Sequence, residues 1–237
     1  MKNLKIVTLG LSLAMLVSCS TNTGSGSLIG AGGGAVLGGV LGAVIGKDAK
    51  GAAIGAAIGG AVGAGTGALI GKHMDKVKAK AQAEMENAKV EEITDANGLK
   101  AVKVTFDSGL LFATSSATLA SKSKADLNDF ATLLKNDADL AVDVQGYTDN
   151  QGWKNSTAEQ SAQKNKALSL DRAAAVSSYL QSLSVPTSQI KSVDGFGEQN
   201  PVASNATAAG QAQNRRVEVY MYASQKMINE ANAQAGK

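Results

Sequence analysis

The chain has 237 residues, of which 44% are hydrophobic, and this fraction excludes wholesale disorder. Its formal net charge of +3 is too small to indicate the concentrated basic surface that binds nucleic acid. One Cys and one His exclude an intramolecular disulfide and a metal site of the multi-histidine kind. We therefore expect no cofactor and no nucleic-acid partner. Only 4% of the residues are aromatic, so the core must be built mainly from Val, Leu, Ile and Ala.

Residues 1–18 are typical of a secretory signal, because two lysines precede an apolar run, Ile6–Val17, that is shorter than the roughly 20 residues needed to cross a bilayer. The run ends in Leu16-Val17-Ser18-Cys19, which resembles the lipobox of bacterial lipoproteins. This resemblance implies that Cys19 is lipidated and becomes the first mature residue, with outer-membrane lipid as its partner. Ser20–Ser27 contains no acidic residue, and the sorting pattern of such lipoproteins then implies the outer membrane.

A glycine ladder follows a flexible tether over residues 19–29. Glycine recurs at every fourth position from Gly30 to Gly46 and again from Gly51 to Gly71. Residues four apart share one face of a helix, so each stretch predicts a helix that a partner helix can approach closely. The ladder resembles the glycine-zipper domain of cell-envelope lipoproteins, and we expect an all-α helical hairpin over residues 30–71. Two alternatives stay open, namely a hairpin at or in the membrane and a hairpin or homo-oligomer outside it.

The remaining chain divides by composition into a spacer, a globular domain and a tail. Residues 72–98 are rich in Lys, Ala, Gln and Glu and predict a charged helical spacer, and residues 224–237 predict a frayed helix or a disordered tail. Between them, residues 99–223 predict an α+β domain. Its expected strands are 101–106, 140–147, 190–196 and 216–222, and its expected helices are 121–135 and 164–183. The order is β-α-β-α-β-β, a mixed sheet with helices packed on it.

The arginines of the chain are confined to this domain. Of 23 basic residues only Arg172, Arg215 and Arg216 are arginine. The guanidinium group is a rigid fork that suits a carboxylate, whereas lysine is a mobile point charge. A binding role for these side chains competes with structural salt bridges, for example between Arg172 and Asp149 or between Arg216 and Glu218.

Four sequence blocks in this domain look like those of the OmpA-like peptidoglycan-binding domain. They are Gly146-Tyr147-Thr148-Asp149-Asn150-Gln151-Gly152, Asn165-Lys166-Ala167-Leu168-Ser169-Leu170-Asp171-Arg172-Ala173, Gly195-Phe196-Gly197-Glu198-Gln199-Asn200-Pro201 and Asn214-Arg215-Arg216-Val217-Glu218-Val219. The resemblance covers about Leu99–Tyr222. With the lipobox and the glycine ladder, the whole chain resembles the OmpA-family outer-membrane lipoproteins of the Pal/YiaD kind.

The resemblance implies that the ligand is the peptide stem of peptidoglycan, usually its diaminopimelate, which carries an ammonium beside a carboxylate. Asp149 matches the family's ammonium-binding Asp, and Arg172 matches its carboxylate-binding Arg. Asn165 lies two helical turns before Arg172 and can add a hydrogen bond. The expected rim and supporting residues are Thr148, Asn150, Arg215 and Arg216. No nucleophile or metal ligand is implied, so the expected task is binding and not catalysis.

Two departures from the family pattern concern this site. The stretch from Gly152 to Asn165 is longer than the usual linker and contains Trp153; it lengthens the helix, covers the site or is an exposed insertion. Around Phe112–Ser115, where relatives often carry acidic or Asn residues, this chain offers only backbone groups and hydroxyls.

These observations predict a tether that holds the outer membrane to the cell wall, with the C-terminal domain in the periplasm. In the alternative, the glycine ladder is an oligomerising or membrane-perturbing module that carries the function, and wall binding only keeps the protein attached to the wall. A wall hydrolase is disfavoured because the sequence offers neither a metal set nor a Ser/Cys–His arrangement.

Overall fold

The computed structural model describes residues 62–236, apart from residues 96 and 122–123. The helices are α2 (Ala64–Glu84), α3 (Ser108–Leu111), α4 (Lys124–Lys135), α5 (Ala158–Ser182), α6 (Ala208–Asn214) and α7 (Gln225–Ala235). The strands are β1 (Ala88–Thr94), β2 (Lys100–Asp107), β3 (Leu140–Tyr147), β4 (Ile190–Gly195) and β5 (Arg216–Ala223). The four strands and two helices expected in the α+β domain are present, and β1, α3 and α6 are additional.

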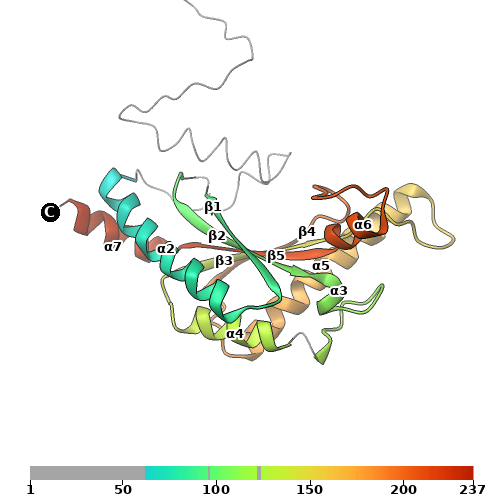
Figure 1. Cartoon of the computed structure of the whole chain (residues 1–237), viewed down its shortest axis with the longest axis horizontal. Coiled ribbons are helices and arrows are strands. Elements are labelled where there is room, and N and C mark those ends of the chain that lie inside the picture. Colours follow the sequence, from blue (N-terminus) through green and yellow to red (C-terminus); the bar gives the residue numbers. More distant parts are fainter. Residues whose placement is uncertain (1–61, 96, 122–123, 237) are drawn as a thin grey trace, which may run out of the picture. The chain divides into compact units, whose positions relative to one another are not determined.

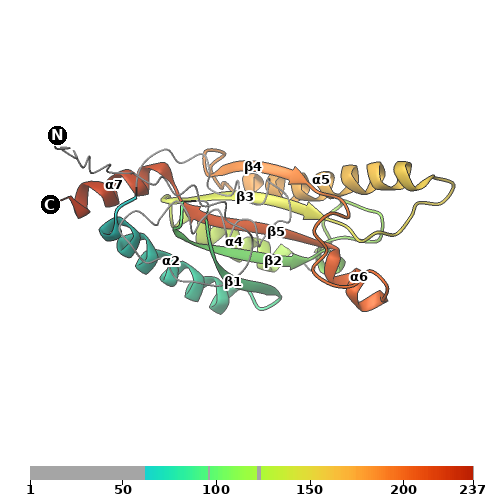
Figure 2. The ribbon, with the colours of Figure 1, turned by 90° about the horizontal axis from the view of Figure 1, so that it is seen from above.

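The five strands form one mixed sheet in the order β1-β2-β5-β3-β4 (Figure 2). Neighbouring strands are antiparallel except for β3 and β4, which run parallel and are connected through α5. A parallel pair needs a crossover, which a helix usually provides. Helices α4 and α5 lie on one face of the sheet (Figure 1). The prediction of an α+β domain with a mixed sheet and packed helices is confirmed.

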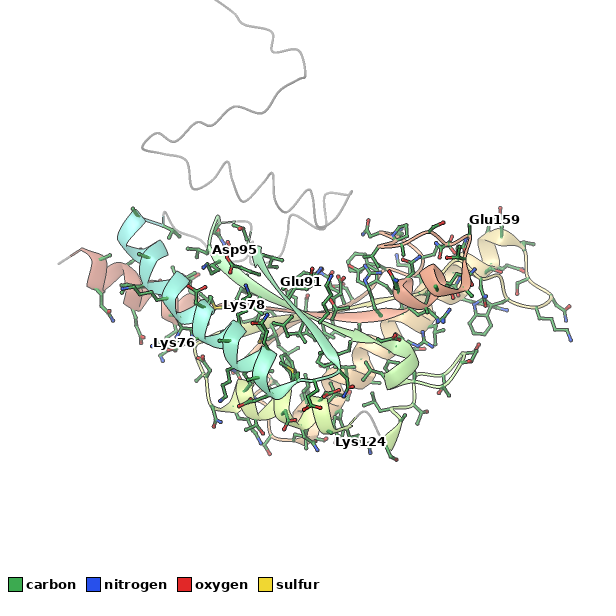
Figure 3. The ribbon with its side chains drawn as sticks, in the orientation of Figure 1. Lys76, Lys78, Glu91, Asp95, Lys124 and Glu159 are labelled. Carbon is green, nitrogen blue, oxygen red and sulfur yellow. The ribbon has the colours of Figure 1, made fainter. Side chains whose placement is uncertain are left out.

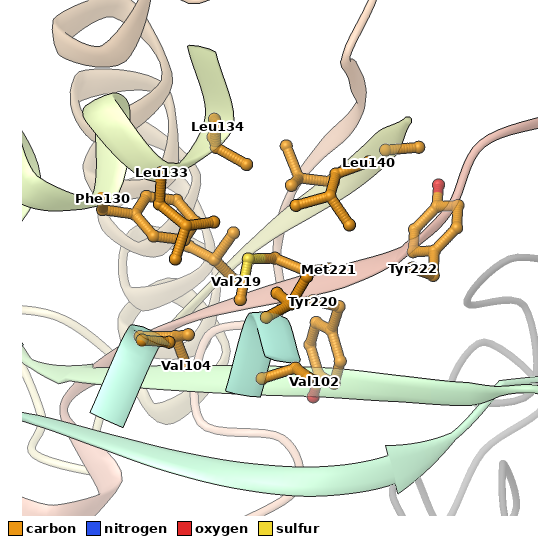
Figure 4. Packing of buried hydrophobic residues seen from close by; sticks show 14 of the residues in the cluster. Val102, Val104, Phe130, Leu133, Leu134, Leu140, Val219, Tyr220, Met221 and Tyr222 are labelled. Carbon is orange, nitrogen blue, oxygen red and sulfur yellow. The ribbon is translucent and has the colours of Figure 1, made fainter. Parts of the chain in front are cut away.

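The hydrophobic core lies between this face of the sheet and its helices (Figure 4). Alternate residues of a strand point to the same face, so one set of apolar residues from each strand faces α4. The set includes Val102, Val104, Leu140, Val219 and Met221, and Phe130, Leu133 and Leu134 of α4 belong to the same core cluster; none of these side chains is more than 2% exposed. Aliphatic side chains thus dominate the core, and Phe106 and Phe130 meet edge to face with their ring centroids 5.9 Å apart.

The signal, Cys19 and the glycine ladder up to residue 61 lie outside the described residues. The last glycines of the ladder belong to α2 or directly precede it, and open space surrounds the position of a β-carbon at Gly63, Gly67 and Gly71. Across residues 62–236, no helix is both long enough and apolar enough to span a membrane.

Helix α2 belongs to the folded unit, so the prediction of a spacer over residues 72–98 is wrong in this respect. Ile70, Met74, Val77 and Ala81 are buried in the core cluster. They recur at intervals of four, three and four residues and therefore form one apolar face of the helix. The lysines and acidic residues that indicated a spacer occupy its other faces.

Residues Ala88–Thr94 form strand β1 and not helix, which is a second correction to the spacer. The strand pairs with β2 at the edge of the sheet. Its charged side chains make ion pairs with neighbouring elements: Glu91 with Lys103 at 3.0 Å and Glu92 with Lys78 of α2 at 3.2 Å. Figure 3 labels Glu91 on this strand and Lys78 on α2. Charged residues protect an edge strand from pairing with other chains, so a composition that indicated a solvated helix also fits an edge strand.

The C-terminal tail is also ordered, contrary to the expectation of a frayed helix or disorder. It forms α7, whose Met227, Ile228 and Ala231 are buried. The helix packs along α2, where the Thr66 hydroxyl donates a 2.6 Å hydrogen bond to Asn232 Oδ1. Gly65 of α2 directly faces Ala235 at this contact, since an added β-carbon would lie 2.9 Å from the Ala235 side chain.

Helix α5 approaches the sheet through two glycines. A β-carbon on Gly146 of β3 would overlap the backbone of Ser169, and one on Gly195 of β4 would overlap the backbone of Leu170. We expect Gly146→Ala to lower the free energy of unfolding by about 3 kcal/mol, because backbone cannot move aside as a flexible side chain can. Gly71→Ala is the matched control and should raise it by about 0.5–1 kcal/mol, since that position is helical and open. Urea unfolding of both variants measures the difference; equal effects would contradict this packing.

His73 connects α2 to the turn after α4. Its Nε2 atom lies 2.7 Å from Asp137 Oδ2, and the close approach of this carboxylate raises the pKa of His73 above its usual value, although burial opposes the shift. A raised pKa in the folded state means that the contribution is complete below the unfolded pKa of about 6.5 and is lost as the pH rises through the folded pKa.

The unfolding free energy of wild type should therefore fall between pH 5.5 and pH 8.5, relative to that of His73→Gln, by at most about 1 kcal/mol, because the pair is partly exposed. Urea unfolding at both pH values measures this difference. Parallel pH profiles of the two proteins would show that the ion pair does not stabilise the docking of α2.

Candidate ligand-binding cleft

The sheet topology brings three loops to one edge of the sheet. Strand β5 is antiparallel to both β2 and β3, and Arg216 at its start pairs with Asp107 and Tyr147 at their ends. The segments after β2, after β3 and before β5 therefore meet there, and Figure 1 shows α3, α6 and the first turns of α5 gathered at this end. They surround a cleft of about 860 Å³. Its lining comes from residues 108–115, 148–154, 165–172 and 208–215.

Asp149 follows β3 and is only 6% exposed. Its Oδ2 atom accepts a hydrogen bond from Arg215 Nη1, and its Oδ1 atom accepts one from the backbone N–H of Gln151 at 3.1 Å. The side chain of Arg215 is 35% exposed and lies at the rim of the cleft. The carboxylate is thus fixed by its own loop and by the residue that precedes β5.

Arg172 projects from α5 into the same cleft and is 3% exposed. Its Nε atom donates a 3.0 Å hydrogen bond to the carbonyl of Ser116, and its guanidinium carbon lies 5.3 Å from the centroid of the Phe112 ring. Its buried Nη1 atom has no hydrogen-bond partner among the described residues. Burial, together with the nearby positive charge of Arg215, lowers the pKa of Arg172.

Two hydroxyl groups that line the cleft resemble Arg172 Nη1 in being buried without a hydrogen-bond partner in the part of the chain that the structure describes. Within the described part of the chain, Ser108 Oγ and Thr148 Oγ1 are buried and lack a hydrogen-bond partner. Buried polar atoms in native proteins nearly always have a hydrogen-bond partner, so these three atoms around one cleft are available to bind a ligand or water. The charged residues of the lining are Asp149, Lys154, Arg172 and Arg215, so the cleft favours a ligand with net negative charge.

Asn165 lies in the cleft wall, but its side-chain amide is already hydrogen-bonded to other residues of the chain. Its amide nitrogen donates to the backbone carbonyl of Gln151 at 3.1 Å, and its Oδ1 atom accepts a 2.8 Å hydrogen bond from the indole N–H of Trp153. Asn165 therefore positions the loop between β3 and α5. The insertion that contains Trp153 does lengthen α5, which begins at Ala158 behind a capping box of Thr157 and Gln160.

Five of the residues expected at the site line the cleft, and two do not. Thr148, Asp149, Asn165, Arg172 and Arg215 line it. Asn150 is exposed outside the lining.

Arg216 is buried away from the cleft, where its Nε atom donates to Glu218 at 2.8 Å and its other nitrogens donate to the carbonyls of Asn214 and Asn200, each at 3.2 Å. The salt-bridge alternative is correct for Arg216, whereas Asp149 pairs with Arg215 and not with Arg172.

Sequence reasoning missed several contributors to the cleft, among them Ser108, Lys154, Leu168 and Gln211. Gln211 of α6 accepts a 3.0 Å hydrogen bond from Gln151 and so connects the loop after β3 to the segment before β5. Small polar residues such as Ser108 carry no spacing signal, because only the pairing of β2 with β5 places them at this edge. Residues 112–115 do line the cleft, so the backbone groups and hydroxyls that the sequence offers there are placed where a ligand could contact them.

The domain thus combines a mixed sheet that has helices on one face with an edge cleft that contains a buried carboxylate and a buried guanidinium. Residues 111–215 match the OmpA family model, so this part of the chain is similar to that family. Residues 1–79 match the model of the YMGG-like Gly-zipper family. Both resemblances indicated by the sequence are confirmed.

Two relatives are each similar to nearly half of the chain. The probable lipoprotein YiaD of Escherichia coli is 43% identical over 116 residues, which are 49% of this chain and 46% of that protein. The peptidoglycan-binding protein ArfA of Mycobacterium bovis is 40% identical over 110 residues, which are 46% of this chain and 31% of that protein. The chain thus spans less than half the length of either relative.

A solved structure extends the similarity to the fold. The cell wall anchor of the T6SS from Pseudomonas aeruginosa superimposes with a TM-score of 0.50 at 27% identity, covering 64% of this chain and 97% of that one.

Proposed function

We propose that the domain binds the peptide stem of peptidoglycan without covalent chemistry and that the cleft described above is the binding site. The observation that carries the proposal is the pair of buried, oppositely charged side chains in one cleft, Asp149 and Arg172, with the Arg172 Nη1 atom unpartnered. The names of the peptidoglycan-binding protein ArfA and of the cell wall anchor support the cell wall as the binding partner. The domain binds its ligand and does not convert it chemically.

The ligand that fits the charges is a stem with a free diaminopimelate zwitterion. Its carboxylate accepts from the Arg172 fork, and its ammonium donates to the Asp149 carboxylate. Arg215 already donates a hydrogen bond to Oδ2 of Asp149, so this arginine orients the carboxylate, whose remaining lone pairs stay available to the ammonium group of the ligand. Thr148 and Ser108 supply further donors to the ligand's carboxylate.

In the cell, this binding would make the chain a tether between the outer membrane and the wall. Acylated Cys19 holds the outer-membrane lipid, and the C-terminal domain reaches the wall from the periplasmic side. The lipobox, the Gly-zipper match and the likeness to the lipoprotein YiaD support this arrangement. More than one acyl chain makes such an anchor stable.

Co-sedimentation of the detergent-solubilised full chain with purified, protein-free cell walls tests the proposal. Wild type should pellet with the walls, and Asp149→Asn and Arg172→Met should stay in the supernatant. Asp171→Asn and Lys166→Ala are matched controls, since both residues are exposed on α5 outside the cleft lining, and these variants should pellet like wild type. Wild type that stays in solution although folded would refute wall binding.

A second candidate function places the activity in the glycine ladder as an oligomerising or membrane-perturbing module. The Gly-zipper match over residues 1–79 favours it. Detergent-resistant oligomers that disappear on Gly38→Leu and Gly59→Leu, while wall binding persists, would support this function.

A further inference from the structure

Trp153 is the only tryptophan of the chain and belongs to the insertion before α5. Two hydrogen bonds to α5 fix it: its backbone N–H donates to Ser161 Oγ at 3.0 Å, and its indole N–H donates to Asn165 Oδ1 at 2.8 Å. The ring is therefore held in one position before any ligand arrives. Preorganised aromatic side chains bind ligands at a low entropic cost.

The ring is half-buried and lines the cleft of the candidate site. Its polar N–H edge is already satisfied by Asn165, so a ligand meets only the apolar surface of the ring. Lys164 Nζ lies over one face, 5.8 Å from the ring centroid.

Hydrogen-bonding side chains line the same cleft as Trp153. Gln151 donates through its amide nitrogen to Gln211 Oε1, which leaves Gln151 Oε1 as an acceptor for a ligand hydroxyl. Lys154 adds a donor. An apolar ring edged by hydrogen-bonding groups fits a ligand that has one apolar face and polar substituents around it.

A pyranose ring has this character, because its axial C–H groups form an apolar face and its hydroxyl and acetamido groups project from the rim. Resting on the proposed function above, we propose that Trp153 is the stacking platform for an amino-sugar ring of the glycan strand, beside the peptide-stem site. The first residue of a stem is joined to such a sugar, so a stem held at Asp149 and Arg172 brings a sugar close to the cleft. The cleft has a volume of about 860 Å³ and therefore accommodates more than one amino-acid residue.

The test compares two probes on the full chain in detergent, namely the free diaminopimelate-containing stem peptide and the same stem attached to its disaccharide. Fluorescence of the single tryptophan and calorimetry give both affinities. Wild type should bind the disaccharide-linked stem about 3- to 10-fold more tightly than the free stem, the range for one aromatic stacking contact. Trp153→Ala should lose this difference and keep its affinity for the free stem within about twofold, measured by calorimetry.

Trp153→Phe retains a ring but loses the bond to Asn165, and it should keep most of the gain from the sugar. Val202→Ala alters an exposed hydrophobic residue, 56% exposed and outside the lining, and should behave like wild type. A gain that is absent in wild type, or that persists in Trp153→Ala, overturns the sugar platform and leaves the proposed function intact. Equal weakening of both probes in Trp153→Ala also overturns it, since that result shows a structural role through Asn165. Failure of wild type to bind either probe rejects the proposed function itself.

Discussion

Arg172→Met is expected to abolish wall binding and to leave the fold at least as stable as wild type. The guanidinium of Arg172 is buried, one of its nitrogens has no partner, and burial together with the charge of Arg215 lowers its pKa. The charged form is therefore penalised in the unliganded protein. Methionine fills a similar volume and removes this penalty, at the loss of the hydrogen bond to Ser116 and of the contact with Phe112. We expect the free energy of unfolding to stay the same or to rise by about 1 kcal/mol.

The same substitution at the other buried arginine should have the opposite result. Arg216 bonds Glu218, two backbone carbonyls and the face of Tyr147, with its guanidinium carbon 3.8 Å from that ring centroid. Arg216→Met leaves the buried Glu218 carboxylate with the Tyr220 hydroxyl and with Lys103, whose Nζ atom lies 3.9 Å from Glu218 Oε1. Breaking a buried pair from one side costs about 3–5 kcal/mol, so this variant should unfold at much lower urea concentration.

Urea unfolding and wall co-sedimentation of both variants measure these effects together. The pairing of outcomes separates a residue kept for binding from one kept for folding. An Arg172→Met variant that loses several kcal/mol of stability would assign Arg172 a structural role and contradict the account of the cleft.

The second large effect concerns the start of the domain. A chain that begins at residue 62 should unfold cooperatively, whereas one that begins at residue 99 should lose most of its stability, although the OmpA family match begins only at residue 111. Such a truncation removes β1 and α2 and uncovers the core against which Ile70, Met74 and Val77 pack. Each large apolar side chain contributes about 1.5–3 kcal/mol when buried, so three of them approach the whole stability of a typical domain.

Far-ultraviolet circular dichroism during urea titration of the two chains tests this prediction. A chain beginning at residue 86, which keeps β1 and lacks α2, separates the two contributions and should fall between them. Equal unfolding midpoints for the chains beginning at 62 and 99 would contradict this prediction and would indicate that residues 72–98 are a spacer separate from the folded domain.

The sequence predicted the α+β sheet because alternation is strong in the central strands. Val102, Val104 and Phe106, like Val217, Val219 and Met221, repeat with a period of two, and tertiary context agrees with that local pattern. β1 was missed because an edge strand carries charges on both sides, and its Lys and Glu content matches that of a solvated helix. α2 was placed correctly as helix over Lys72–Glu84, but its apolar face was not recognised as a docking surface because the partner residues lie far along the chain.

The site was predicted through the family blocks and not through spacing. Asp149 and Arg172 were placed in one site because both match motif positions, and the sheet topology does bring them to one cleft. Arg215 and Arg216 are adjacent in sequence, yet consecutive residues at the start of a strand point to opposite sides, so one reaches the cleft and the other is buried beneath Tyr147. No local pattern identifies which of the two faces a ligand until the strand register is known.

The most direct test of the central claim measures whether each charge of the ligand is bound by its own side chain. The full chain is titrated with a stem peptide that ends in diaminopimelate, with the same peptide acetylated on the distal ammonium, and with the same peptide amidated on the neighbouring carboxylate. Wild type should lose about 10- to 100-fold in affinity with either modification. Asp149→Asn should become insensitive to acetylation alone, and Arg172→Met should become insensitive to amidation alone. If both variants keep the wild-type penalties for both modifications, Asp149 and Arg172 do not hold the zwitterion and the proposed site is wrong.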